Sequence, residues 1–159
     1  MKKFAALLLP LVLVSAPALA VEHLAVYGGS FDVLDSKSYA QIGAEYRFNE
    51  VFKGLRPTVG LNSTDEGDVY GYGGVNWDIP LGGSGFYLTP NFMVGAYHQG
   101  DGKDLGGALE FRSGIEGSYE FGNGSRLGAT FNHISNAGIY DHNPGAEALL
   151  VVYQHPLTW

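Results

Sequence analysis

The sequence predicts an all-β protein, an eight-stranded antiparallel transmembrane β-barrel preceded by a signal peptide. Three observations lead to this prediction. Apolar and polar residues alternate along about eight segments of near ten residues, as in strands with two different faces. No apolar run after the first 20 residues approaches the roughly 20 residues of a transmembrane helix. Aromatic residues gather near the ends of the segments, and glycine, tyrosine and phenylalanine are frequent, with 24, 10 and 9 residues.

Residues 1–20 have the three parts of a secretory signal peptide. Lys2 and Lys3 form a charged start, an apolar stretch follows from Phe4 to Val14, and residues 18–20 (Ala-Leu-Ala) give a small-x-small cleavage site. The apolar stretch is too short for a membrane helix. We therefore expect one mature domain, the barrel, over residues 21–159.

Charge and cysteine content exclude several classes of protein. Removing residues 1–20 leaves seven basic and sixteen acidic side chains, a formal charge of −9. A strongly acidic domain lacks the basic footprint of a nucleic-acid-binding protein. The chain has no cysteine, so neither disulfides nor lipid attachment to a cysteine can hold an exported domain of this kind. We expect its own core, or a membrane, to stabilise it.

Turn signals between the alternating segments set the expected strand boundaries. Along the second strand the even positions from 40 to 48 are apolar, whereas Gln41, Glu45 and Arg47 fall on the other face. The sixth strand repeats this pattern, and its polar face carries charges of both signs that can pair inside a narrow barrel. The expected strands cover residues 23–31, 39–48, 54–63, 69–80, 85–98, 106–121, 125–136 and 147–157.

A soluble β-sandwich with one wet face is the alternative fold. The positions of the aromatic residues favour a membrane barrel, because they match the girdles at a membrane interface. The chain also ends on an aromatic residue after an alternating strand, which resembles the C-terminal signal of bacterial outer-membrane proteins. Pro156 is unusual in a paired strand, so the sequence does not fix the register in which the first and last strands pair to close the barrel. The aromatic residues concerned are Phe48, Phe52, Trp77, Phe86, Tyr119, Phe121 and Trp159.

With both termini in the periplasm, the connections after strands two, four and six are short periplasmic turns. These turns lie around residues 49–50, 81–83 and 122–124. The more polar stretches 32–38, 64–68 and 100–104 then face outside. The seventh strand also runs outward, which places its last residues near the outer surface of the membrane.

The end of the seventh strand carries the residues that point to chemistry. His133 and Ser135 are two apart in a strand and therefore share a face, where the imidazole could take the hydroxyl proton. A hairpin through residues 143–145 (Asn-Pro-Gly) could bring Glu147 beside His133 as an orienting acid. Nucleophile, base and orienter are the three roles of a serine hydrolase.

The strand parity puts these three residues on the apolar, lipid-facing side of the barrel. His133 and Ser135 share parity with Leu127 and Phe131, and Glu147 shares parity with Leu149. Polar groups on a lipid face cost several kilocalories per mole unless they satisfy one another. A cluster of polar residues on this face indicates that the protein acts on a lipid substrate. No metal site is predicted, since the other histidines and the acidic run 65–68 lack metal-ligand spacing.

The segment His133-x-Ser135-Asn136-Ala137, followed by Asn143-Pro144-Gly145-x-Glu147, resembles the PagL-type lipid A 3-O-deacylases. The motif covers about fifteen residues, while the eight-strand pattern and the terminal aromatic fit this family over the mature chain. The resemblance implies a bacterial outer-membrane barrel that hydrolyses the 3-linked (hydroxy)acyl ester of lipid A, or lipopolysaccharide, in the outer leaflet.

The resemblance also implies roles for individual residues. Ser135 would be the nucleophile, His133 the general base and Glu147 its orienter. Asn136 and the backbone around Gly138 would form the oxyanion hole, and Asn143 is expected to support it; donors to a developing oxyanion are usually a large term in catalysis. The reaction needs neither a metal nor an organic cofactor, and the enzyme is expected to be a monomer or a homodimer.

Three other functions remain open at this point. An outer-leaflet phospholipase would use the same residues, because headgroup and acyl selectivity lie in loops and grooves. A small structural or adhesive barrel would be indifferent to Ser135→Ala, apart from effects on folding. A soluble periplasmic binding module would be extracted without detergent and would show no heat-dependent shift in gel mobility.

Overall fold

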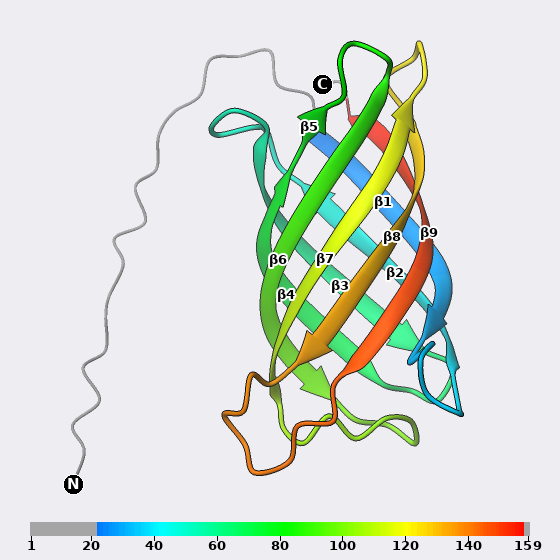
Figure 1. The fold of residues 1–159 in the computed structure, drawn as a ribbon, viewed down its shortest axis with the longest axis vertical. Coiled ribbons are helices and arrows are strands. Elements are labelled where there is room, and N and C mark those ends of the chain that lie inside the picture. Colours follow the sequence, from blue (N-terminus) through cyan, green and yellow to red (C-terminus); the bar gives the residue numbers. More distant parts are fainter. Residues whose placement is uncertain (1–21, 158–159) are drawn as a thin grey trace, which may run out of the picture.

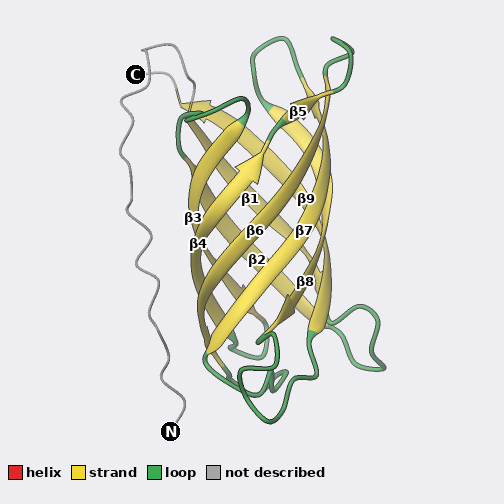
Figure 2. Cartoon of the chain, turned by 60° about the vertical axis from the view of Figure 1, so that its left-hand side comes forward, coloured by secondary structure: helices red, strands yellow, loops and turns green. Residues whose placement is uncertain are grey.

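The computed structural model describes residues 22–157, which form one closed antiparallel barrel (Figures 1 and 2). Eight long strands make its wall, as the sequence predicts. The strands β1 and β9 pair with each other, and so do β4 and β6, which closes the sheet. The elements are β1 (Glu22–Phe31), β2 (Tyr39–Arg47), β3 (Leu55–Thr64), β4 (Val69–Trp77), β5 (Ile79–Pro80), β6 (Phe86–His98), β7 (Leu109–Glu120), β8 (Arg126–Ser135) and β9 (Ala146–Leu157).

The two ends of the barrel differ. Residues 48–54, 78–85 and 121–125 make the connections at one end, called here the turn end, where β1 begins and β9 ends. The connections 32–38, 65–68, 99–108 and 136–145 form the other, called the loop end, and the two longest connections, 99–108 and 136–145, are among them. The expected signal peptide, residues 1–20, and Trp159 lie outside the described residues. Within 22–157, no helix is long and apolar enough to cross a membrane.

One expected strand, residues 69–80, is divided into β4 and β5. The partner strand β6 explains the division. Asn76 pairs with Asn91 and Ile79 with Leu88, so Trp77 stands opposite Pro90. Proline has no backbone N–H to donate to the ladder, and the pairing is interrupted there before it resumes in β5.

The strand expected at 106–121 begins later, at Leu109, because residues 99–108 form a loop that packs over the loop end.

Pro156 lies in the part of β9 that pairs with one neighbouring strand only. The pairing of β9 with β8 ends at Gln154, while the pairing with β1 continues through Pro156 opposite His23. The missing N–H therefore costs little at this position.

The lumen is filled by paired charges, as the alternation of β2 and β7 predicts. Arg47 lies 2.8 Å from Glu116 and 2.9 Å from Glu45, and Arg112 lies 2.7 Å from Glu45. All four side chains are buried. Nearer the turn end, Asp78 accepts hydrogen bonds from two further arginines, and Thr89 bonds it too. These bonds link β2, β3, β7 and β8 across the lumen and give a stiff wall.

The outer face of the wall is apolar. Ile42, Leu61 and Val151 are between 56 and 70% exposed, which suits a barrel that faces lipid. The predicted aromatic girdle is present at the turn end, where Phe86 and Tyr119 pack edge to face with ring centroids 5.0 Å apart. The core of the protein is thus the lumen, where the buried charges lie beside a cluster of buried apolar residues that includes Met93, Leu150 and Val152, while the outer surface of the wall is hydrophobic.

Candidate active site

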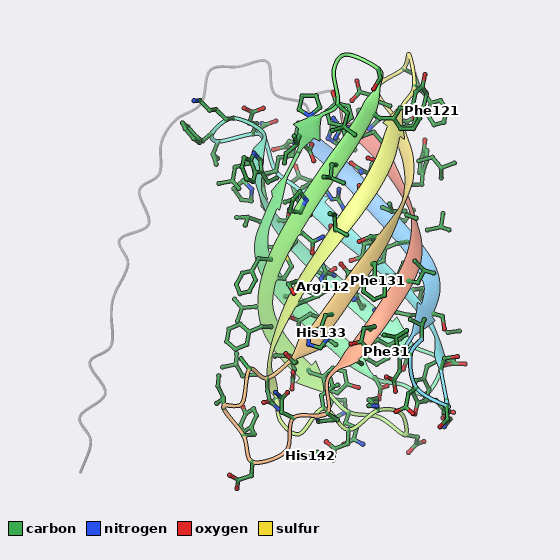
Figure 3. The ribbon with its side chains drawn as sticks, in the orientation of Figure 1. Phe31, Arg112, Phe121, Phe131, His133 and His142 are labelled. Atoms are coloured by element: carbon green, nitrogen blue, oxygen red, sulfur yellow. The ribbon has the colours of Figure 1, made fainter. Side chains whose placement is uncertain are left out.

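The strands β8 and β9 place His133 and Glu147 directly opposite each other. Both side chains lie on the lipid-facing side of the wall, next to the loop end, where Figure 3 shows His133. The imidazole Nδ1 lies 2.9 Å from the Glu147 Oε1, and the side chains are 47 and 24% exposed. The predicted contact between this histidine and this carboxylate is confirmed. In the neutral imidazole, a proton on Nδ1 that is donated to the carboxylate leaves the lone pair on Nε2.

Ser135 ends β8 on the same face, half-buried and opposite Phe111. The structure does not bring it into hydrogen-bond contact with His133, and in the described chain its hydroxyl has no hydrogen-bond partner. Ser135 and His133 are nevertheless neighbours along one face. Catalytic hydrogen bonds often tighten only when substrate is bound, so a rotation of the serine side chain is the step that would join the pair.

Gly145 keeps one edge of the imidazole open. It immediately precedes β9 with a φ of 65°, and a Cβ built on it would lie 2.9 Å from His133 Cε1 and 3.6 Å from Nε2. Any side chain here would press on the ring edge that carries Nε2. The glycine therefore serves both the left-handed backbone turn and the position of the imidazole.

Asn136 is fully buried directly behind the serine and joins two loops. Its Nδ2 donates to the carbonyls of Leu105 and His142, each at 2.8 Å, and its Oδ1 accepts from Gly138 N at 3.0 Å. Asn143 Oδ1 accepts from Asn136 N, also at 3.0 Å. Both amide hydrogens are used in this arrangement, so Asn136 could donate to an oxyanion only if one of these bonds broke.

The chain leaves β8 through two residues with positive φ, Ala137 (54°) and Gly138 (74°). A positive φ is costly for a residue with a Cβ, and the hydrogen bonds of Asn136 hold the turn. Gly138 N and Ile139 N both donate to Asn136. Within the described chain, the N–H of Ala137 has no acceptor and is free to bind a ligand.

Two supporting contacts were missed by the reasoning from sequence. A Cβ on Gly106 would lie 1.9 Å from the His142 carbonyl oxygen, so only glycine allows the loops 99–108 and 136–145 to approach this closely. Tyr140 packs on Gly107, and its hydroxyl accepts a hydrogen bond from Leu109 N at 3.2 Å. Neither contact follows a local pattern, since the partners are about 30 residues apart.

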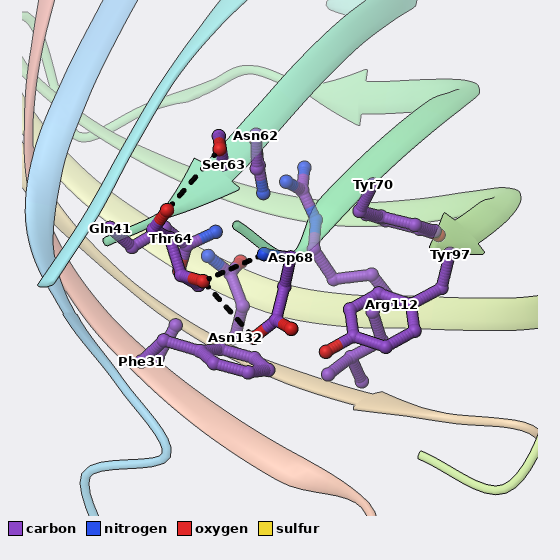
Figure 4. Close-up of a pocket in the computed structure, with 12 residues that line it drawn as sticks. Phe31, Gln41, Asn62, Ser63, Thr64, Asp68, Tyr70, Tyr97, Arg112 and Asn132 are labelled. Carbon is purple, nitrogen blue, oxygen red and sulfur yellow. Dashed lines mark hydrogen bonds between the residues drawn. The ribbon is translucent and has the colours of Figure 1, made fainter. Parts of the chain in front are cut away.

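A cavity in the lumen near the loop end is separate from this site (Figure 4). Asn132 and Ile134 line it, while His133 between them points through the other side of the wall. Thr64 and Asp68 close its rim with a 3.0 Å hydrogen bond. Among residues 22–157, no group of three or more histidine, aspartate or glutamate side chains is arranged to hold a metal ion.

The loops of the loop end are also tied by charge. Lys103 lies 2.8 Å from Asp32 and 2.9 Å from Asp35. Partial burial lowers the pKa of Lys103, but the hydrogen bonds to the two carboxylates outweigh it and raise the pKa above its usual value. The same hydrogen bond from Lys103 lowers the pKa of Asp35. The loop 99–108 thus connects the β1–β2 loop to the loop that carries Asn143.

Fold and site together define a membrane-spanning β-barrel with a hydrolase-type histidine–carboxylate pair on its lipid-facing wall. The family model described as "Lipid A 3-O-deacylase (PagL)" matches residues 39–156. The chain therefore belongs to the lipid A 3-O-deacylase (PagL) family, and it is an outer-membrane β-barrel that acts as an ester hydrolase on lipid A.

Solved structures agree on the fold. The crystal structure of the outer membrane enzyme PagL matches with a TM-score of 0.64 and 20% identity, over 86% of this chain and 99% of that one. A de novo designed transmembrane β-barrel (12% identity, 87% and 96% covered) and Neisserial surface protein A (13%, 86% and 96%) each give a TM-score of 0.56. No curated protein sequence matches. Since a designed barrel shares the fold, the fold by itself carries no activity.

Proposed function

We propose that Ser135, His133 and Glu147 form a catalytic triad that hydrolyses the 3-linked (hydroxy)acyl ester of lipid A in the outer leaflet. One observation carries this proposal, the 2.9 Å contact between His133 Nδ1 and Glu147 Oε1 on the outer face of the wall. Ionisable side chains that face lipid are costly, and in membrane proteins they mark functional sites. Ser135, two residues away on the same face, is the hydroxyl nearest to it along β8.

The reaction begins with the neutral imidazole. His133 Nε2 takes the Ser135 hydroxyl proton while Oγ attacks the ester carbonyl carbon, and Glu147 stabilises the imidazolium that forms. The tetrahedral intermediate then collapses. The bond from the carbonyl carbon to the sugar oxygen breaks, the proton on Nε2 passes to that oxygen, and the acyl chain stays on Ser135.

The second half of the reaction repeats these steps with water. His133 takes a proton from a water molecule, which attacks the acyl-enzyme, and the fatty acid leaves as Ser135 regains its proton. Each proton taken by the histidine is returned within the same half-reaction. The site is therefore restored after every turnover.

The oxyanion of both intermediates needs a hydrogen-bond donor near Ser135. The backbone N–H of Ala137, which has no acceptor among the described residues, is our candidate. It belongs to the turn around Gly138 that Asn136 and Asn143 hold in place. In this proposal the two asparagines act as positioning residues, and the backbone supplies the donor.

The loop end faces outward in this proposal, because outer-membrane barrels carry short turns on the periplasmic side and longer loops outside. His133 and Glu147 then lie at the level of the outer-leaflet lipids. The ester bonds of lipid A, where the acyl chains meet the sugar, lie at the boundary between the polar and apolar parts of that leaflet. The site and the scissile bond are therefore at matching depth.

The test is mass spectrometry of lipid A from bacteria that express the full chain. We expect the parent to remove one 3-linked acyl chain and Ser135→Ala to remove none, a loss of at least about 10⁴-fold. Ser63→Ala, the same change on the outer face of β3, is the matched control and should act like the parent. A heat-dependent shift in gel mobility would verify that every variant is a folded barrel. Unchanged lipid A with a folded parent would overturn the proposal.

A further inference from the structure

A groove runs along the outer wall on the side of His133 that faces away from Glu147. It is lined by Asn91 of β6, Ser113, Gly114 and Ile115 of β7, and Phe131 and His133 of β8. Ile115 and Phe131 are 46 and 41% exposed on its flanks. Figure 3 shows Phe131 and His133 following each other along β8. An apolar groove that reaches the base of a lipid hydrolase is suited to hold the acyl chain.

Ser113 is the one hydroxyl in this groove. It stands directly opposite His133 across the β7–β8 ladder, so His133 lies between Glu147 on one side and Ser113 on the other. The Ser113 side chain is exposed, and within the described residues it makes no hydrogen bond. A hydroxyl that faces lipid without a partner is unfavourable. A bound ligand with a hydroxyl of its own would provide that partner.

The distance from Ser113 to Ser135 fits one kind of acyl chain. Phe111 is the direct partner of Ser135, so Ser113 is the diagonal neighbour, roughly 7–8 Å away and somewhat less between the Cβ atoms. During attack the carbonyl carbon lies about 3 Å from Oγ of Ser135. A hydroxyl on the third carbon of the chain is three single bonds of about 1.5 Å further on. It would therefore come within hydrogen-bond reach of Ser113.

We infer that Ser113 is a specificity-determining residue that binds the hydroxyl on carbon 3 of the acyl chain being removed. The inference rests on the proposed function, since it needs Ser135 as the nucleophile. The bond holds the carbonyl carbon above Ser135, and the rest of the chain lies between Ile115 and Phe131. The enzyme therefore prefers 3-hydroxyacyl esters to unsubstituted acyl esters of the same length.

The experiment measures kcat/KM of the full-length protein on two lipid A-type glucosamine esters, which carry 3-hydroxyacyl or unsubstituted acyl chains of equal length. We expect the parent to prefer the hydroxylated ester by about three- to tenfold, the range of one neutral hydrogen bond. Ser113→Ala should abolish the preference by slowing only the hydroxylated ester. Ser113→Thr, which keeps the hydroxyl, should retain the preference, and Ser63→Ala should leave it unchanged.

The outcomes separate this inference from the proposed function. Equal rates on both esters with the parent, or an unchanged preference in Ser113→Ala, would overturn the role of Ser113 and leave the triad standing. A decrease on both esters by the same factor in Ser113→Ala would indicate a structural role only and would overturn it too. If the folded parent cleaved neither ester, the proposed function would fail and the inference with it.

Discussion

Glu147 and His133 face each other across two antiparallel strands, with 2.9 Å between Oε1 and Nδ1. Asn132 and Ile134, the neighbours of His133 along β8, point into the lumen. The pair therefore belongs to the lipid-facing surface, while a separate set of charges fills the interior. In the proposed function, catalysis and barrel stability therefore depend on different residues, which mutations can tell apart.

The carboxylate of Glu147 is expected to act through its charge. Glu147→Gln keeps an oxygen that can accept from Nδ1–H but removes the negative charge that stabilises the imidazolium. We expect kcat to fall by about 10²–10⁴-fold with little change in KM, measured on purified protein with lipid A as substrate. Glu22→Gln, a change of another outward-facing carboxylate at the turn end, should have no such effect. A KM effect without a kcat effect would argue for a role in substrate binding instead.

Gly145 provides a test of how closely the histidine must be held. Gly145→Ala places a methyl group against the His133 ring, which would have to move. We expect kcat to fall by about 10–100-fold, since displacements near 1 Å are costly in catalysis, while stability falls by only about 1 kcal/mol for the strained φ. Gly67→Ala adds the same strain, at a φ of 81°, in open space. Comparable losses of activity in both variants would contradict the role given to Gly145.

Substitutions of Asn136 test whether this residue holds the two loops together or donates a hydrogen bond to the oxyanion. Asn136→Ala removes the bonds to the Leu105 and His142 carbonyls and leaves both unsatisfied, at about 1–3 kcal/mol each. Asn136→Asp keeps the shape but cannot donate to them. We expect both variants to lose activity and to become sensitive to protease in loops 99–108 and 136–145. Loops that stay protected in an inactive Asn136→Asp variant would favour direct donation to the oxyanion.

Residue periodicity predicts most of this fold because a strand has a period of two and each face has one environment. The alternation along residues 39–48 was enough to assign Glu45 and Arg47 to the lumen, and the same parity placed His133 and Glu147 on the lipid side. The break between β4 and β5 was not predictable in this way. It depends on Pro90, 13 residues from Trp77 in the chain, being its partner across the ladder.

The loop contacts that hold the site in place could not be predicted from the sequence for a related reason. Asn136 binds the backbone carbonyls of Leu105 and His142, and a carbonyl group is the same in every residue. No residue type therefore marks the loop 99–108 as its partner. Gly106 was visible as a glycine, but its use as a close-approach position depends on where His142 lies. Side-chain patterns give faces and strand ends, whereas loop contacts through the backbone need the folded structure.

The buried charges of the lumen give a prediction for stability without loss of activity. Glu45 accepts hydrogen bonds from Arg47, Arg112 and Tyr72 at 2.7–3.0 Å. Glu45→Gln leaves Arg112 buried without a carboxylate, and breaking a buried pair in this way costs about 3–5 kcal/mol. We expect the midpoint of unfolding in urea to be lower than that of the parent. The heat-dependent gel shift measures the folded fraction at each urea concentration. The specific activity of the folded fraction should stay the same, because the proposed triad lies on the other face of the wall.

The matched control for Glu45 is Glu66→Gln in the β3–β4 loop, where the carboxylate pairs with Lys37 at 3.4 Å on the surface. Exposed pairs of this kind contribute at most about 1 kcal/mol, so its unfolding midpoint should stay close to that of the parent. An equal shift in both variants would mean that the lumen charges are screened by water and do not cross-link the wall. A large loss of specific activity in folded Glu45→Gln would mean that the lumen and the outer site are coupled through the strands that carry them.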